Sequence, residues 1–392
     1  MAATAPDICL YFQAHQPNRL RAYSFFDIGV SPFYEDDALN GEIVQRVADH
    51  CYRPANAMFL ELAERHGKKF KMALSISGVL IEQFEHHCPD VLESFVQLHD
   101  SGCVELLCET YYHSLCFRSC GREFTRQVKL QAKKIKEVFG AKPKVFRHTE
   151  LVYFNELAAF VEDLGFKGML AEGVDRVLHG RSPNHVYRSP NVKKLKTLTR
   201  NSTLSDDLGF RFADTAWSEH PLTAEKFAGW LAGERGDVVN LFLDYETIGE
   251  HQRAESGIFE FWRHLPEAAI AAGCRFVTPS EAIKRHKVAG EYDCHEITTW
   301  ADIGKDLSPW KANPMQYEAK KKILDMRHDV KACKDPDFLH QWSKMQTSDH
   351  FYFMSTKGGD DGAVHGYFRP YASPYDAYVY FMNALSDLQV RA

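Results

Sequence analysis

The chain of 392 residues is long enough for two or three domains, or for one large barrel with an appended region. With 45% hydrophobic and 26% charged residues, its composition is ordinary for a folded protein and excludes collagen-like, disordered and coiled-coil classes. A net charge of −6 argues against a nucleic-acid partner, because phosphates bind to positively charged surfaces.

Targeting segments and cysteines indicate where the protein works. No stretch approaches the roughly 18 apolar residues of a membrane span, and the apolar run at residues 8–12 is too short for a signal peptide. We therefore expect a cytoplasmic protein without a membrane partner. The 10 cysteines are spread along the chain and predict free thiols. A cluster without C-x-x-C spacing does not predict a metal site; it consists of Cys103, Cys108, Cys116 and Cys120.

Up to about residue 285, short β-branched or aromatic runs alternate with longer amphipathic segments, which is typical of βα units. The expected strands are Ile8–Gln13, Phe70–Ser77, Val104–Glu109, Lys144–Arg147, Gly168–Ala171, Val238–Asp244 and Arg275–Val277. The expected helices are Gly41–His66, Pro89–Asp100, Glu123–Phe139, Phe154–Leu164, Thr223–Gly233, Gly257–Ala272 and Pro279–His286. Residues 174–212 are richer in Ser, Asn, Arg and Lys and predict a loop with an inserted hairpin. Seven strands in this pattern predict an α/β fold built on an incomplete (β/α)7 barrel.

After about residue 290 the pattern changes to helices without strands. The expected helices are Pro314–Cys333, Asp335–Met354 and Pro374–Leu388, and Gly- and Pro-rich links such as residues 357–362 separate them. We therefore expect a C-terminal helical bundle packed on the barrel. The predicted division is a catalytic barrel over residues 1–288 and a helical domain over residues 289–392.

The residues that end the predicted strands are mostly polar. In parallel barrels the chemistry lies just past the carboxyl ends of the strands, so these side chains are expected to converge at one mouth. They are Gln13 and His15 after the first strand, Glu109 after the third, Arg147, His148 and Glu150 after the fourth, Glu172 after the fifth, and Asp244 and Glu246 after a later one.

Two of these carboxylates suit the cleavage of a glycosidic bond, which requires one nucleophile and one proton donor. Asp244 follows the apolar run 238–243, whose burial is expected to raise the pKa of the carboxyl and favour a proton donor. Glu150 follows Arg147, His148 and the hydroxyl of Thr149, which are hydrogen-bond donors that favour an ionised nucleophile. The pattern alone leaves open that both are ordinary loop carboxylates.

Other assignments at these strand ends also stay open. Glu246 is the main rival for the acid, because side chains two apart on a strand share a face. His15 is either a buried histidine bonded to backbone or a contact to a sugar hydroxyl. No two of the 19 His residues have H-x-x-x-H spacing, and no G-x-G-x-x-G, P-loop or G-x-S-x-G motif is present. We therefore expect neither a metal nor a cofactor.

Five stretches in the same order give the chain a recognisable pattern. They are His15–Pro17, Gly102–Leu106 with its continuation Tyr111–Ser114, Phe146–Leu151, Asp244–Gln252 and Thr278–Ala282. With these stretches the chain resembles glycoside hydrolase family 57, most closely its α-amylase-type members. Three segments of the C-terminal part also resemble the helical region of that family: Pro314–Gln316, Ser348–Tyr352 and Ser373–Ala377.

The resemblance implies an incomplete (β/α)7 barrel with a helical bundle that contributes to the cleft, acting on α-glucans with retention of the anomeric configuration. By motif, Glu150 matches the nucleophile, Asp244 the general acid/base, His15 a substrate-binding histidine and Asp349 an acidic residue that the bundle lends to the cleft. Further expected substrate contacts are Gln13, Glu109, His113, Arg147, His148, Trp217, Glu246 and His350. Gln13 and His148 depart from the family pattern, in which an acidic residue or His and an Asn are expected.

Our hypothesis from the sequence is a retaining enzyme that cuts α-1,4 bonds of maltodextrin, starch or glycogen. Interception of its intermediate by a second glucan would instead make it a 4-α-glucanotransferase or branching enzyme. A non-catalytic glucan-binding protein is the alternative from another class, and a metal-dependent deacetylase is disfavoured by the missing histidine pair. The sequence leaves the oligomeric state open.

Overall fold

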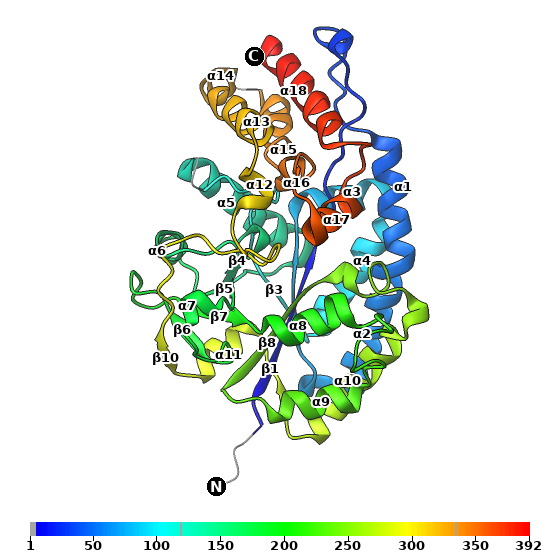
Figure 1. The fold of residues 1–392 in the computed structure, drawn as a ribbon, viewed down its shortest axis with the longest axis vertical. Helices are drawn as coiled ribbons and strands as arrows, with labels where there is room; N and C mark the ends of the chain where they lie inside the picture. Colours follow the sequence, from blue (N-terminus) through cyan, green and yellow to red (C-terminus); the bar gives the residue numbers. More distant parts are fainter. Residues whose placement is uncertain (1–4, 118–119, 334) are drawn as a thin grey trace.

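The strands of this α/β fold form two sheets in the computed structural model, which describes residues 5–117, 120–333 and 335–392 (Figure 1). The first sheet contains β1 (Asp7–Ala14), β2 (Met72–Ile76), β3 (Val104–Leu106), β8 (Val238–Asp244) and β9 (Arg275–Phe276). The second contains β4 (Val145–Arg147), β5 (Gly168–Glu172), β6 (Val186–Arg188), β7 (Lys196–Arg200) and β10 (Val288–Glu291).

The first sheet is parallel throughout and has β1 at its centre. Its order is β3-β2-β1-β8, and β9 pairs with the first two residues of β1. Gln13 of β1 is in register with Ser75 of β2 on one side and with Asp244 of β8 on the other. The carboxyl ends of these three strands are therefore level.

The second sheet has the order β10-β6-β7-β5-β4 and meets the first sheet at two places. A parallel bridge joins Cys108, after β3, to Phe146 of β4. At the other junction the backbone N–H of Asn201, after β7, donates to the carbonyl oxygen of Asn240 in β8 at 2.9 Å. These contacts bring the ends of β1, β4 and β8 to the same side of the molecule.

Every expected strand overlaps an observed one, and the inserted hairpin is also found. It consists of β6 and β7, which pair in antiparallel fashion. Beyond this expectation, β7 pairs in parallel with β5 and is a full member of the sheet. Its sequence, Lys-Thr-Leu-Thr-Arg, has the β-branched residues that suit a strand, and four of the five residues are buried. The strands are divided between two sheets, whereas one barrel was expected.

Helices surround the sheets and connect their strands. They are α1 (Asp37–Val47), α2 (Arg53–His66), α3 (Gly78–His87), α4 (Pro89–Asp100), α5 (Gly121–Phe139), α6 (Asn155–Asp163), α7 (Asp175–Leu178), α8 (Ser202–Asp206), α9 (Ala224–Gly233), α10 (Ile258–Ala271) and α11 (Pro279–Arg285). The helix expected over residues 41–66 is divided into α1 and α2 by a π-helical turn at Ala48–Tyr52. The cap expected before Pro279 is present, since Thr278 accepts from the N–H of Glu281.

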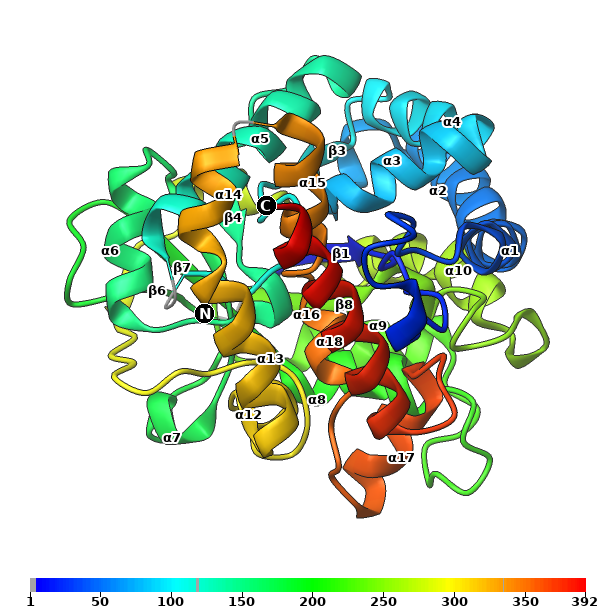
Figure 2. The same ribbon diagram turned by 90° about the horizontal axis from the view of Figure 1, so that it is seen from above.

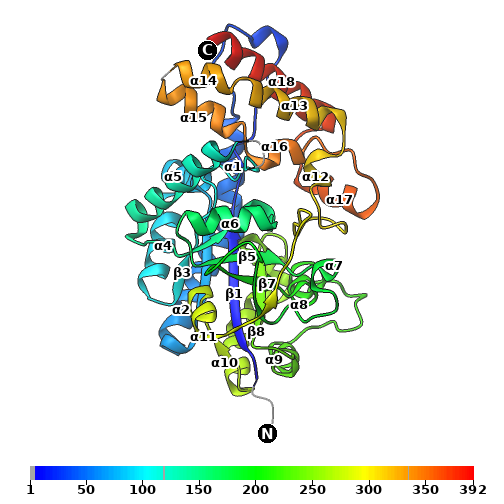
Figure 3. The same cartoon turned by 90° about the vertical axis from the view of Figure 1, so that its left-hand side faces the viewer.

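Seven helices occupy the described part of the chain after residue 307, where three were expected. They are α12 (Ser308–Lys311), α13 (Pro314–Asp325), α14 (Arg327–Cys333), α15 (Pro336–Lys344), α16 (Ser348–Tyr352), α17 (Gly359–Phe368) and α18 (Pro374–Arg391). The Gly-rich stretch 357–362, expected to be a link, includes the first turn of α17. The helical region lies beyond the carboxyl end of β1, as Figure 3 shows from the side and Figure 2 from above.

The helical region shares its apolar core with an early part of the chain. Leu20, Tyr23 and Tyr34, which follow β1, are buried in the same cluster as residues of α13, α15, α16 and α18. Among the described residues, no helix has the length and apolar character needed to cross a membrane. All 10 cysteines are free thiols.

Candidate active site

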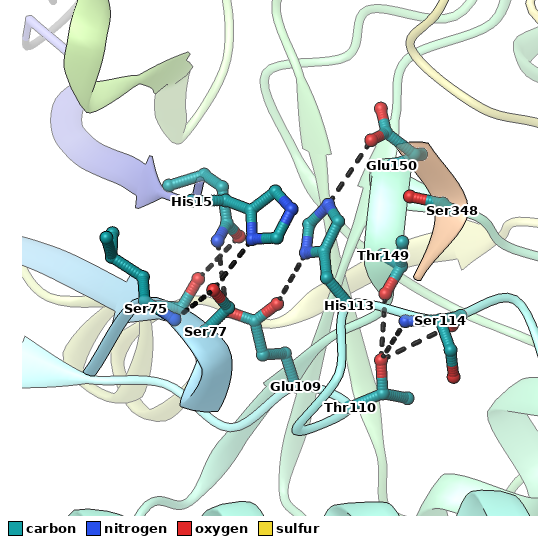
Figure 4. Close-up of polar contacts among 12 residues, drawn as sticks. His15, Ser75, Ser77, Glu109, Thr110, His113, Ser114, Thr149, Glu150 and Ser348 are labelled. Atoms are coloured by element: carbon teal, nitrogen blue, oxygen red, sulfur yellow. Dashed lines mark hydrogen bonds and ion pairs between the residues drawn. The ribbon is translucent and has the colours of Figure 1, made fainter. Parts of the chain in front are cut away.

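The ends of β1, β4 and β8 and the loop after β3 bring several ionisable side chains together. The candidate pair is Glu150, in a short 3-10 turn after β4, and Asp244, the last residue of β8. Thr110 supports the turn from below, because its hydroxyl lies 2.9 Å from the hydroxyl of Thr149 (Figure 4). The predicted convergence of strand ends is therefore present for these residues.

His113 lies between two carboxylates at the centre of the site (Figure 4). Its Nδ1 is 2.9 Å from Oε2 of Glu109, and its Nε2 is 3.2 Å from Oε1 of Glu150. His113 and Glu150 both have left-handed backbone conformations, with φ of 50° and 58°. Such strained residues concentrate at functional sites, where surrounding contacts hold them in place.

This arrangement keeps the central groups charged. Burial would lower the pKa of His113, but the hydrogen bonds and charges of Glu109 and Glu150 raise it to about 9. Burial would raise the pKa of Glu150, but the hydrogen bond and charge of His113 hold it below its usual value. The same balance lowers the pKa of Glu109. Glu150 is therefore an ionised carboxylate at neutral pH, with 21% of its side chain exposed.

Asp244 has a different electrostatic environment. Burial, followed by the negative charge of Glu150, raises the pKa of Asp244 to about 6. At pH 7 an acid with this pKa carries a proton in about one molecule in ten, compared with fewer than one in a thousand at the ordinary value of 3.8, and can donate it. One carboxylate is thus ionised and the other is poised to be a proton donor.

Glu246, the rival acid, is buried with its own partners. Its Oε1 accepts from the hydroxyl of Tyr52 at 2.5 Å and from the backbone N–H of His15 at 3.1 Å. Burial and the nearby charge of Asp244 raise the pKa of Glu246 to about 8. At neutral pH Glu246 is therefore largely protonated. With only 4% of the residue exposed, it forms part of the wall of the site.

His15 connects the end of β1 to the helical region. Its Nδ1 is 2.7 Å from the hydroxyl of Ser77, and its Nε2 is 3.0 Å from Oδ2 of Asp349 on α16. The ring stacks on His113 with centroids 3.8 Å apart (Figure 4). Burial and the charge of His113 lower the pKa of His15. Burial alone would raise the pKa of Asp349, but His15 keeps it well below its usual range.

Gln13 supports Glu109, at one of the two positions that depart from the family pattern. Its Nε2 donates to Oε1 of Glu109 at 3.0 Å. Its Oε1 accepts from the hydroxyls of Tyr11 and Ser75, at 2.9 and 2.7 Å. With 2% exposure, Gln13 acts through the chain Gln13–Glu109–His113 that ends on Glu150.

His148, the other departure, lies beside aromatic side chains away from this chain. Its ring is 5.4 Å from Phe124 and 6.2 Å from Phe146, centroid to centroid. Burial and the charge of Arg147 lower the pKa of His148 to about 3, so its ring is neutral. In this structure His148 contributes to packing below the site.

Two further predicted residues lie at the edge of the group. His350, next to Asp349, is buried beside Phe381, and burial lowers its pKa to about 4. Trp217 packs against Trp230, with ring centroids 6.2 Å apart, and joins the core around the first sheet. The structure therefore gathers the other predicted residues in and around the site and places Trp217 against the core of the first sheet.

Three residues of the site were not among the predicted ones. Trp300, between β10 and α12, donates its indole N–H to Oε2 of Glu150 at 2.8 Å. Tyr52 reaches Glu246 from the π-helical turn before α2, and Ser77 holds His15. Tyr52 and Trp300 do not end a strand, whereas Ser77 ends the expected strand Phe70–Ser77 and directly follows β2, so its position was a signal that the prediction did not use. No group of three or more His, Cys, Asp or Glu in the described ranges is arranged to hold a metal.

A family model and a known protein each match most of this chain. A family model described as Glycosyl hydrolase family 57 matches residues 9–295. A protein of Methanocaldococcus jannaschii named "Putative alpha-amylase" is 41% identical over 395 aligned positions, covering 97% of this chain and 84% of the relative. The chain belongs to glycosyl hydrolase family 57, and it is a glycoside hydrolase.

Solved structures show the same fold. A GH57-type branching enzyme from Pyrococcus horikoshii superimposes with a TM-score of 0.68 at 16% identity, covering 93% of this chain and 87% of that one. A 4-alpha-glucanotransferase from Thermococcus litoralis gives a TM-score of 0.66 at 16% identity. That match covers 88% of this chain and 56% of the other chain. At these identities the likeness extends to the fold.

Proposed function

We propose that the protein is a retaining α-glucan hydrolase of the α-amylase type that cleaves α-1,4 bonds in maltodextrin, starch or glycogen. The observation that carries this proposal is the electrostatic contrast between Glu150, held ionised by His113, and Asp244, whose buried carboxyl has a pKa of about 6. A double displacement requires one ionised nucleophile and one protonated acid. The similarity to a protein named for α-amylase activity supports the choice of substrate.

In the first step the carboxylate of Glu150 attacks the anomeric carbon and forms a glycosyl ester. Asp244 transfers its proton to the glycosidic oxygen, and the shortened glucan leaves with that proton. His113 and Trp300 hold one oxygen each of Glu150, which orients the nucleophile before the substrate binds.

In the second step Asp244 removes a proton from water, and the resulting hydroxide displaces Glu150 from the anomeric carbon. The ester carries no negative charge on Glu150, so one of the two causes that raise the pKa of Asp244 is absent in the intermediate. The pKa of Asp244 therefore falls once the intermediate has formed. The same residue thus acts first as an acid and then as a base.

The remaining polar residues are proposed to hold the substrate or the catalytic pair. His15 and Asp349 are the partly exposed members of the group and are proposed to bind sugar hydroxyls. The buried members act through their neighbours; they are Gln13, Glu109, His113, Arg147, His148, Glu246 and His350. Trp217 is proposed as a stacking surface for a sugar ring.

The proposal extends to the organisation and location of the protein. We propose residues 1–288 as the catalytic part and residues 289–392 as a helical part that completes the site through Asp349. Free thiols throughout the chain favour a reducing compartment, and the proposed location is the cytoplasm.

The test compares wild type with Glu150→Gln and Asp244→Asn on maltoheptaose, with products resolved by size and by anomer. We expect short α-anomeric sugars from wild type. The loss for Glu150→Gln is expected to exceed ~10⁴-fold, as for the nucleophile of other covalent mechanisms. For Asp244→Asn it is expected to be about 10²–10⁴-fold. Glu137→Gln, a matched change on the exposed face of α5, is expected to leave turnover unchanged.

Each other outcome has a defined meaning. A ladder of products above seven units contradicts hydrolysis and assigns the protein to glucan transfer through the same intermediate. The absence of turnover by wild type on maltoheptaose and glycogen contradicts the enzymatic proposal and favours a glucan-binding role. β-Anomeric first products contradict the retaining mechanism.

A further inference from the structure

Trp300 reaches Glu150 from a distant part of the chain. It lies between β10 and α12, outside residues 9–295 that match the family model. Its indole N–H donates to Oε2 of Glu150 at 2.8 Å, and its backbone N–H donates to the carbonyl oxygen of Glu150 at 3.2 Å. Two hydrogen bonds from one residue therefore tie both the side chain and the backbone of Glu150.

Arg147 lies over the face of the same indole. Its guanidinium carbon is 4.9 Å from the ring centroid of Trp300. The residue is fully buried, and within the described ranges none of its three guanidinium nitrogens has a hydrogen-bond partner. A buried cation without hydrogen bonds is costly, so its presence here requires a compensating interaction.

A second arginine near the ring shows how unusual Arg147 is. Arg200 lies 5.8 Å from the ring centroid of Trp300. It donates to the carbonyl oxygen of Phe242 at 2.8 Å, to Asp206 at 2.5 Å and to Glu172 at 3.4 Å. Arg200 is thus satisfied by conventional acceptors. The interactions that compensate the charge of Arg147 are with the aromatic face and with the nearby carboxylates, including Glu150.

A cation over an aromatic face attracts the electrons of the ring. In Trp300 this withdrawal leaves the indole N–H more positive and makes it a stronger donor to a carboxylate, since hydrogen bonds in a buried network polarise one another. The effect is directed at Oε2 of Glu150, because that oxygen accepts the N–H.

The segment that carries Trp300 is anchored on both sides. Lys305 pairs with the buried Glu172 of β5. Asp302 accepts from Lys357 at 2.7 Å and lies 3.1 Å from Nε2 of His365 on α17. The segment with the indole is therefore held between the second sheet and the helical region.

We propose that Trp300 is a positioning residue for the nucleophile, and that Arg147 on its face strengthens and orients the hydrogen bond to Glu150. This inference rests on the proposed role of Glu150 as nucleophile. According to this proposal, the helical region sets the geometry of Glu150 through the segment that carries Trp300. This role is separate from any contact that the helical region makes with the substrate.

The kinetic test uses Trp300→Phe, which keeps an aromatic ring and removes the N–H. We expect kcat to fall about 10- to 100-fold, the value of one hydrogen bond to a charged group, with KM little changed. Loss of the donor raises the pKa of Glu150, so the acidic limb of kcat/KM moves to higher pH. Arg147→Met is expected to move the limb in the same direction, and Arg147→Lys to restore part of it. Trp230→Phe, the same change on α9, is the matched control and is expected to change neither kcat nor the position of the acidic limb.

A raised KM with an unmoved acidic limb in Trp300→Phe would overturn the proposal, because it would make Trp300 a sugar-stacking surface only. Equal effects of Arg147→Met and Arg147→Lys would overturn the role of the charge. These outcomes differ from a failure of the proposed function, in which wild type itself turns over no α-glucan.

A second measurement needs no turnover. In protein labelled with ¹⁵N-tryptophan, the indole signal of Trp300 is identified as the one missing from Trp300→Phe. We expect that signal to move in Glu150→Gln and in Arg147→Met and to stay in place in Glu137→Gln. An indole signal that is unchanged in both Glu150→Gln and Arg147→Met would overturn the proposal even in an active enzyme.

Discussion

At the scale of single residues, three carboxyl groups of the site bind their protons with different strengths. His113 keeps Glu150 ionised, burial and Glu150 raise the pKa of Asp244 to about 6, and burial raises that of Glu246 to about 8. The order follows from the surroundings: a cation beside Glu150 lowers its pKa, and burial next to an anion raises the pKa of Asp244 and of Glu246. The hydrogen bonds that Glu246 accepts from Tyr52 and from the N–H of His15 offset only part of this rise. Neighbouring side chains thus give three similar groups three roles.

Replacement of Glu246 by Gln tests this order. The folded protein holds a proton on Glu246 up to pH of about 8, whereas an unfolded chain releases it near the ordinary value of 4.5. Protonation therefore favours folding, and wild-type stability is expected to fall as pH rises between these values. Glu246→Gln keeps a neutral acceptor for Tyr52 and lacks this fall. In thermal denaturation, we expect the Tm of Glu246→Gln to rise relative to that of wild type between pH 5 and pH 8.

The comparison variant is Glu246→Ala, which removes the acceptor of Tyr52 and His15 and is expected to cost about 1–3 kcal/mol. Parallel stability curves for wild type and Glu246→Gln would contradict a protonated Glu246. Activity adds a second criterion, because Glu246→Gln is expected to keep most of its turnover. A loss as large as that of Asp244→Asn would move the acid role to Glu246.

At the scale of elements, α18 is attached to the start of the chain by one buried carboxylate. Asp387 accepts from the hydroxyl of Tyr34 and the backbone N–H of Gly29, both at 2.6 Å, and from Arg391 at 2.5 Å. Burial would raise its pKa, but the hydrogen bonds of Arg391 and Tyr34 lower it. Asp387 thus connects α18 and the guanidinium of Arg391 to the loop that carries Gly29 and Tyr34.

Asp387→Asn is expected to lower the unfolding free energy at pH 7 by about 2–3 kcal/mol, because several donors lose a charged acceptor. A carboxylate with a lowered folded pKa stabilises the protein above its unfolded pKa and loses this effect as pH falls through the folded value. The difference between variant and wild type is therefore expected to shrink in acid. Thermal or denaturant unfolding from pH 7 to pH 3 measures the loss of stability at pH 7 and its decrease in acid.

The matched control is Asp325→Asn, which breaks an exposed pair with Lys321 on α13 and is expected to change stability by less than about 0.5 kcal/mol. An equal effect of both substitutions, or a difference that widens in acid, would contradict the assignment to Asp387.

The predictability of the site also depends on its elements. Glu150, Asp244 and Glu109 could be found because each follows a recognisable strand, and parallel strands bring their carboxyl ends together. Tyr52 could not be found this way, because it reaches Glu246 from a π-helical turn where the sequence indicated one continuous helix. Trp300 lies in a segment without a periodic pattern, 150 residues from its partner.

At the scale of the whole molecule, the two proposed parts interpenetrate. Leu20, Tyr23 and Tyr34 belong to the barrel part by sequence and to the helical core by packing. The strand order was also only partly predictable, since the hairpin strand β7, expected as an insertion, pairs with β5 and becomes a full member of the second sheet. Short local patterns identify strands, whereas the pairing of distant segments depends on packing that they do not encode.

Because of this shared core, we expect the full chain to unfold in a single transition. Calorimetry is expected to give one peak whose calorimetric and van't Hoff enthalpies agree, and tryptophan fluorescence is expected to change at the same temperature. Two separated transitions would contradict the coupling and would show that residues 1–288 and 289–392 unfold independently.

The segment after β1 also affects how the chain emerges from the ribosome. Residues 20–34 leave the tunnel well before their partner α18 is made. At bacterial or eukaryotic rates of about 5–20 residues per second, this early segment waits roughly 20 to 70 seconds for its packing surface. It carries Phe25, Phe26 and Phe33, which stay largely exposed even in the folded protein. Nascent chains of this protein are therefore expected to expose Leu20, Tyr23 and Tyr34 next to these three phenylalanines until α18 has been made.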